Sequence, residues 1–141
     1  MQRMIRLTIL VLTCISFVGC DDDGRIETYP VSGKVVFADG TPLKGGTVLC
    51  MSESAETTLS ARGNIAEDGT FTLGTYEGND GAVEGSHLVA IDPPMPENFN
   101  PDDGPAPRVI HPRFQRHRTS GLTFEVGSDG PNEVTLEVSR K

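Results

Sequence analysis

The sequence predicts an all-β domain, specifically a seven-stranded antiparallel β-sandwich. Short runs of alternating apolar and polar residues recur about every 8 to 15 residues, as they do in sandwiches and barrels. The 16 glycines and 10 prolines among 141 residues favour frequent turns. No run after residue 19 repeats apolar residues at the helical spacing. A chain of this length forms one domain at most.

Residues 1–19 have the pattern of a secretory signal peptide. Arg3 and Arg6 give it a positive start, an apolar run follows, and the small Gly19 ends it. A membrane-spanning helix needs about 20 mostly apolar residues, whereas this run stops at Cys20 and three aspartates. We therefore expect residues 1–19 to be removed from the mature protein.

The junction at residues 17–20, Phe-Val-Gly-Cys, resembles a bacterial lipobox, with Phe17 in place of the usual Leu. The resemblance implies that Cys20 becomes the mature N-terminus and carries a thioether-linked diacylglycerol. Two or three acyl chains hold a soluble domain at a bilayer, whereas a single chain binds only marginally. Residues 20–29 then comprise the lipidated cysteine and a short acidic tether. The alternative is a plain secreted protein in which Cys20 has no special role.

Charge and cysteine content narrow the partners and bonds that are possible. The formal net charge is −8, and removal of the signal peptide with Arg3 and Arg6 would lower it to −10. Such an acidic domain is unsuited to nucleic acid or to direct adhesion to anionic lipid. Cys14 belongs to the signal peptide and Cys20 to the anchor, so Cys50 is left without a disulfide partner. We expect Cys50 to be a small buried hydrophobe.

Each expected strand is a short run bounded by turn residues, with apolar side chains on at least one face. The seven strands span residues 31–37, 47–51, 60–66, 70–73, 87–91, 122–126 and 134–138. In the first strand, Val31, Val35 and Phe37 share one face. A glycine pair precedes the second strand, the third is weaker, and Asp68 with Gly69 predicts a tight hairpin turn into the fourth.

The fifth strand stops at two prolines, and the last two strands show the clearest alternation of all. Residues 122–126, with Phe124 on the apolar face, and residues 134–138 each alternate strictly between apolar and polar. Because six turn-forming residues join them, we expect an antiparallel hairpin with one face in the core.

Residues 93–120 form an unusually long connection between the fifth and sixth strands. Loops beyond about 15 residues in a compact domain are either functional or disordered, and the sequence leaves both readings open. The connection has an acidic half with Asp102 and Asp103, followed by a basic half. The basic half contains His111, Arg113, Arg116, His117 and Arg118.

Several strands and turns together resemble the carboxypeptidase regulatory-like, or transthyretin-like, β-sandwich modules. The resemblance rests on residues 31–37, 39–43, 46–48, 68–71 and 85–89. It places the module at residues 30–141 and implies an immunoglobulin-like or transthyretin-like sandwich. The closing part, residues 119–126 with Asn132 and Glu133, is similar to small exported lipoproteins common in planctomycete-like bacteria.

This resemblance implies a non-catalytic role at cell surfaces, in adhesion or in large exported assemblies. Hydroxyisourate hydrolases, which share the transthyretin fold, end in Tyr-Arg-Gly-Ser, whereas this chain ends in Val-Ser-Arg-Lys. We therefore expect neither enzymatic activity nor a cofactor.

Two loop-based ligand sites remain as alternatives. Arginine forks bind carboxylate and sulfate groups, so the loop could hold an anionic glycan; its candidate residues are Arg113, Arg116, His117 and Arg118. The basic neighbours of the two histidines disfavour zinc there. A calcium site would use turn carboxylates, although their spacing is not that of an EF-hand; these are Asp39, Asp68, Asp80 and Asp129.

We expect a lipid-anchored sandwich with a structural or protein-interaction role in the cell envelope. Its membrane contact would run through the N-terminal lipid, and the sequence does not identify its protein partner. It would be exported to the cell membrane or the outer membrane, with the domain in the periplasm or at the cell surface.

Overall fold

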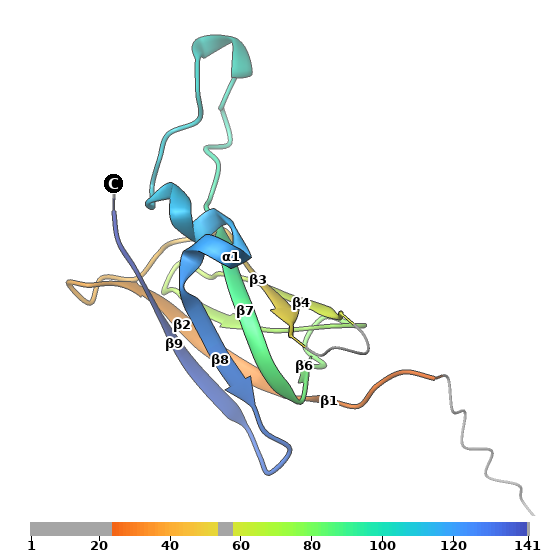
Figure 1. Ribbon diagram of the computed structural model, residues 1–141. Helices are drawn as coiled ribbons and strands as arrows, with labels where there is room; N and C mark the ends of the chain where they lie inside the picture. Colours follow the sequence, from red (N-terminus) through yellow and green to blue (C-terminus); the bar gives the residue numbers. More distant parts are fainter. Residues whose placement is uncertain (1–23, 54–57, 141) are drawn as a thin grey trace, which may run out of the picture.

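The computed structural model describes residues 24–53 and 58–140 (Figure 1). The strands in these ranges are β1 (Thr28–Tyr29), β2 (Val31–Phe37), β3 (Thr47–Ser52), β4 (Ser60–Asn64), β5 (Thr70–Thr72), β6 (Ala82–Val83), β7 (Gly85–Asp92), β8 (Leu122–Val126) and β9 (Asn132–Val138). Three short helical segments lie between β7 and β8. They are η1 (Pro101–Asp103), η2 (Pro112–Gln115) and α1 (His117–Ser120).

Two sheets pack against each other, so the predicted all-β sandwich is confirmed. One sheet has the strand order β5-β2-β9 and the other has the order β4-β3-β7-β8, while β1 and β6 form a short separate pair. All seven expected strands are present with small changes at their ends. The pair β1 and β6 was not expected, and it places Thr28 and Tyr29 in a strand rather than in the tether.

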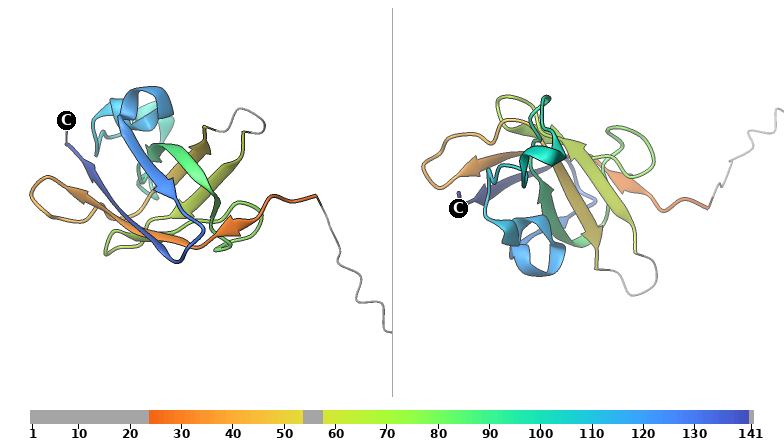
Figure 2. Two further views of the ribbon diagram at one scale, coloured as in Figure 1. Left: turned by 60° about the horizontal axis from the view of Figure 1, so that its bottom comes forward. Right: turned by 90° about the horizontal axis from the view of Figure 1, so that it is seen from above.

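The predicted hairpin between the last two strands is wrong. β8 pairs antiparallel with β7, whereas β9 pairs parallel with β2, so the sandwich is not wholly antiparallel. Figure 2 shows β8 and β9 diverging from their common turn into different sheets. Each strand buries its apolar face by lying opposite the other across the core. The Asn132 side chain stabilises this crossing, because it accepts from the Gly127 N–H and donates to the Pro30 carbonyl.

The turn at Asp68 and Gly69 is confirmed, but it joins β4 and β5, which belong to different sheets. Gly69 has a φ of +83°, a conformation that other residues rarely adopt. A Cβ on Gly69 would also lie 2.8 Å from the Val35 carbonyl oxygen. Glycine is therefore required here both by its backbone angle and by the close approach of β2.

The core fills the space between the sheets and is mostly aliphatic. Its buried members include Val35 and Leu136 from one sheet and Val48 and Val89 from the other. Cys50 is also buried and is a free thiol, which confirms its predicted role as a small hydrophobe.

Residues 93–120 divide into two structurally different parts. The first part projects beyond the sandwich and carries η1 (Figure 1). The second part returns to the sandwich and buries Ile110, Phe114 and Ser120. The His111 N–H donates to the Ser139 carbonyl just after β9, and the Ser120 hydroxyl donates to the Val89 carbonyl in β7. The second part is therefore an integral piece of the fold.

Candidate functional site

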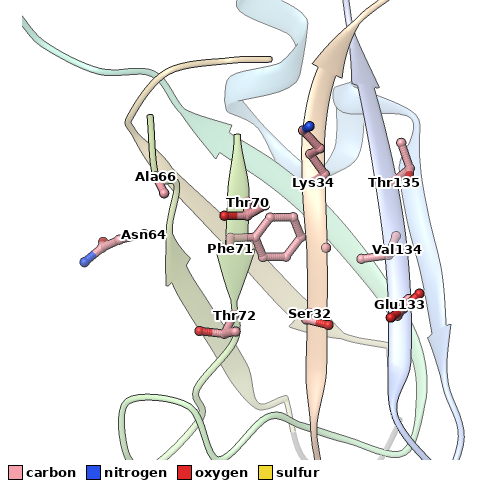
Figure 3. Close-up of a pocket in the computed structure, with 11 residues that line it drawn as sticks. Ser32, Lys34, Asn64, Ala66, Thr70, Phe71, Thr72, Glu133, Val134 and Thr135 are labelled. Carbon is pink, nitrogen blue, oxygen red and sulfur yellow. The ribbon is translucent and has the colours of Figure 1, made fainter. Parts of the chain in front are cut away.

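A shallow hollow of about 660 Å³ lies on the outer face of the β5-β2-β9 sheet (Figure 3). Three neighbouring strands set its side chains in two rows, because outward residues alternate with core residues. The first row pairs Ser32 with Thr72 and Glu133, and the second pairs Lys34 with Thr70 and Thr135. Asn64 and Ala66 line one side.

This groove is open, polar and nearly flat, and its floor is formed at Gly33. A Cβ on Gly33 would lie 2.7 Å from the Phe71 ring. Phe71 is itself buried and offers no exposed aromatic platform. Lys34 and Glu133 carry opposite charges, so the groove has no strong preference for one sign of ligand. Its geometry provides hydroxyl and charged hydrogen-bonding groups but no assembled catalytic set.

The predicted calcium ligands are used mainly to stabilise their own turns. Asp39 accepts hydrogen bonds from the Thr41 hydroxyl and N–H at 2.6 and 2.9 Å, and Arg140 pairs with it at 2.9 Å. These contacts lower the pKa of Asp39 to about 2. Asp68 accepts the same two kinds of bond from Thr70, which lower its pKa.

Asp80 stabilises a tighter loop in the same way. Its carboxylate accepts backbone N–H bonds from Thr75, Tyr76 and Glu77 at 2.6, 3.0 and 3.1 Å. Partial desolvation would raise its pKa, but the three N–H donors outweigh it and the pKa is lowered. Asp129 is exposed in the turn before β9. Within residues 24–53 and 58–140, no group of three or more potential metal-ligating side chains is gathered.

Residues 108–118, which we call the arginine segment, contain the predicted anion-binding residues. Arg113 lies in η2 and its guanidinium stacks 4.5 Å from the Phe114 ring centroid. Arg116 connects η2 to α1, which contains His117 and Arg118. The structure therefore brings the predicted set together on two short helical turns. All three arginines are exposed.

Two histidines have features that sequence reasoning did not identify. His87 is 1% exposed, and its Nε2 lies 2.8 Å from the Val83 carbonyl oxygen. Its ring stacks on Phe124, with centroids 5.3 Å apart. In the described part of the chain, His87 Nδ1 and His117 Nε2 are buried without hydrogen-bond partners. His87 is buried because it lies on the same strand face as Val89 and Ile91. The alternation of residues along this strand could therefore have predicted its burial.

Two cysteines complete the list of predicted site residues. Burial raises the pKa of the Cys50 thiol to about 12, so Cys50 is not a nucleophile at neutral pH. Cys20 and the signal peptide at residues 1–19 lie outside the described residues. In the described part, no helix has the length and apolar character needed to cross a bilayer.

Neither a protein-family model nor a curated protein matches the chain. Two solved structures show a partial likeness to it. A DUF3823 family protein from Parabacteroides merdae is 16% identical with a TM-score of 0.45, and the match covers 82% of this chain and 48% of that one. A 9R-lipoxygenase from Cyanothece is 11% identical with a TM-score of 0.40, over 80% of this chain and 16% of that one. The chain thus spans under half the length of either protein.

Proposed function

We propose that this protein is a non-catalytic domain of the bacterial cell envelope, held at a membrane by lipid on Cys20. It would be a lipoprotein of the planctomycete-like kind that the sequence resembles, and it would act through surface contacts. The chemistry of its side chains supports this role, since Cys50 is inert and the turn aspartates are already hydrogen-bonded within the fold.

The observation that carries the proposal is the position of the first strand. β1 begins at Thr28, a few residues after Cys20, and pairs with β6. The Asn132 N–H donates to the Pro30 carbonyl, which places the start of the sandwich beside the start of β9. A lipid on Cys20 would therefore hold this end of the domain close to the bilayer.

The opposite end of β9 bears the arginine segment, because His111 bonds to Ser139 there. Seven extended residues of β9 separate the two ends, a distance of about 20 Å. A domain anchored through Cys20 would thus present the arginine segment away from its own membrane (Figure 1). This orientation supports an interaction role over a purely passive one.

The test is the intact mass of the protein extracted from membranes, beside a Cys20→Ala variant fractionated in the same way. We expect the wild type to begin at Cys20 with the added mass of acyl chains, and the variant to leave the membrane fraction. If both proteins are soluble and unmodified, the chain is freely secreted and the anchor is rejected.

A further inference from the structure

The arginine segment is electrostatically opposite to the rest of the protein. Residues 104–124 contain four arginines and no aspartate or glutamate. The whole chain has a net charge of −8. Because the four arginines contribute +4, all other residues together have a net charge of −12. The arginine segment is therefore a positive region on an otherwise acidic domain.

None of these four charges takes part in an ion pair within the described residues, although the Arg113 guanidinium also stacks on the Phe114 ring. The ion pairs in the described part of the chain join Arg25 to Glu77 and Arg140 to Asp39, and neither involves the arginine segment. Arg108, Arg113, Arg116 and Arg118 are all exposed. Their guanidinium groups are therefore available to an external anion.

The backbone beneath the arginines is held firmly in place. Ile110 and Phe114 are 2% and 1% exposed and belong to the core cluster. The Thr119 hydroxyl donates to the Arg113 carbonyl at 2.7 Å, and the Ser120 N–H donates to the Arg116 carbonyl at 3.0 Å. A fixed backbone reduces the entropy lost when a ligand binds.

A concave surface accompanies the positive charge. Arg108, Ile110 and Gln115 line a hollow of about 190 Å³ together with the prolines at positions 93, 94, 96 and 107. Asp92 also lines this hollow, so it presents both a positive and a negative group. Such a mixed, partly apolar recess suits a sugar ring better than a bare inorganic anion.

We propose that the arginine segment binds an anionic polysaccharide that carries carboxylate or sulfate groups. Arginine forks bind such groups through two parallel hydrogen bonds. A single flexible chain can follow residues 108–118 while the acidic remainder of the domain stays in solvent. A flat anionic bilayer would also meet Asp102 and Asp103 of η1, which lies in the projecting part of the connection, and it is therefore the less favourable partner.

This inference rests on the proposed envelope role only for the choice of partner. Binding would be measured on the membrane-extracted protein in neutral detergent, with fluorescently labelled dextran sulfate and polygalacturonate as probes and uncharged dextran for comparison. We expect binding to either or both anionic polymers, weakened by added salt, and none to dextran.

The variant Arg113→Gln/Arg116→Gln/Arg118→Gln should bind about tenfold more weakly or worse, because three charge-assisted contacts are lost. Its matched control is Lys34→Gln/Lys44→Gln/Arg62→Gln, which removes three exposed charges outside the segment and should retain at least half the affinity. Equal thermal melting of both variants and the wild type verifies that each is folded.

Three outcomes would overturn the inference. The first is no binding to either anionic polymer, and the second is an equal loss of affinity in the two triple variants, which would indicate net charge alone. The third is displacement of the polymer by micelles containing phosphatidylglycerol, which would assign the segment to a lipid surface. None of these results alters the mass measurement at Cys20, so failure here is distinct from failure of the anchor.

Discussion

Asp80 at one end of the sandwich and the arginine segment at the other use their charged side chains in opposite ways. At the tether end, formed by β1, β6 and the loop at residues 74–80, the carboxylate of Asp80 is a structural acceptor for three backbone N–H groups. At the other end, the arginine segment is held by apolar packing and backbone bonds, and its guanidinium groups have no ion pairs within the described residues.

The comparison shows how structural charge can be separated from charge that is available for binding. A charged group that satisfies buried or turn donors contributes to stability, and its removal leaves those donors without a partner. An exposed charge on a firmly packed backbone contributes little to stability. Four substitutions or changes of condition test this distinction.

The largest expected effect is at the packing beneath the arginine segment. Phe114 is 1% exposed, so Phe114→Ala should lower the free energy of unfolding by roughly 3 to 5 kcal/mol. Urea denaturation followed by circular dichroism would measure this loss. Met95→Ala, at an exposed site in the same connection, is the control and should change stability by under about 0.5 kcal/mol. A loss below about 1 kcal/mol for Phe114→Ala would show that the segment is only loosely attached.

The next effect is at the tether end. Asp80→Ala removes the acceptor of three backbone N–H bonds and should lower the free energy of unfolding by roughly 1 to 3 kcal/mol. Asp80→Asn keeps one side-chain oxygen and should lose less. A loss under about 0.5 kcal/mol in Asp80→Ala, measured by the same denaturation, would contradict the structural role given to the carboxylate.

Acid should weaken the tether end through the same group. The backbone donors outweigh desolvation and lower the folded-state pKa of Asp80. A carboxyl with a lowered folded pKa stabilises the fold above its unfolded pKa of about 3.9, and this contribution disappears as the pH falls through the folded value. The urea concentration at the unfolding midpoint should therefore decrease once the pH is lowered below about 4. This decrease should be smaller in Asp80→Asn. Identical pH profiles for the variant and the wild type would assign the acid sensitivity to other groups, such as Asp39.

The smallest expected effect is at the arginines themselves. Arg116 is exposed and makes no side-chain ion pair within the described residues, so Arg116→Gln should change the free energy of unfolding by under about 0.5 kcal/mol. Differential scanning calorimetry would detect a larger change. A clear destabilisation would mean that the fold does use this charge, and the contrast between the two ends would then disappear.

The sequence predicted the strands well because alternation reports which residues are buried. Residues 31–37 form β2 with unchanged bounds, and Phe124 lies on the inward face of β8, although it is only half-buried. The alternation of apolar and polar residues does not show which other strand a given strand will pair with in its sheet. The apolar faces of β8 and β9 are equally well buried in one sheet or across the core, and only the packing of the whole domain decides between them.

The candidate site was predictable in composition but not in structure. The basic residues and the missing acids are visible in the printed sequence, and the two short helical turns that hold them are not. Ile110 and Phe114 are four residues apart, but prolines and polar residues around them interrupt any sustained helical or strand pattern, so the sequence does not mark them as core residues. Likewise, nothing in the sequence marks Asp80 as the acceptor for three backbone N–H groups of its own loop.

The parallel pairing of β2 with β9 has a consequence for the timing of folding. Val31 is opposite Asn132 and Phe37 is opposite Val138, so the first long strand completes its sheet only with the last. Contacts between residues so distant along the chain form slowly, and here they also require residues 132–138 to have been synthesised. A nascent chain therefore cannot close this sheet early. If it is exported while it is being synthesised, this sheet would close only on the far side of the membrane.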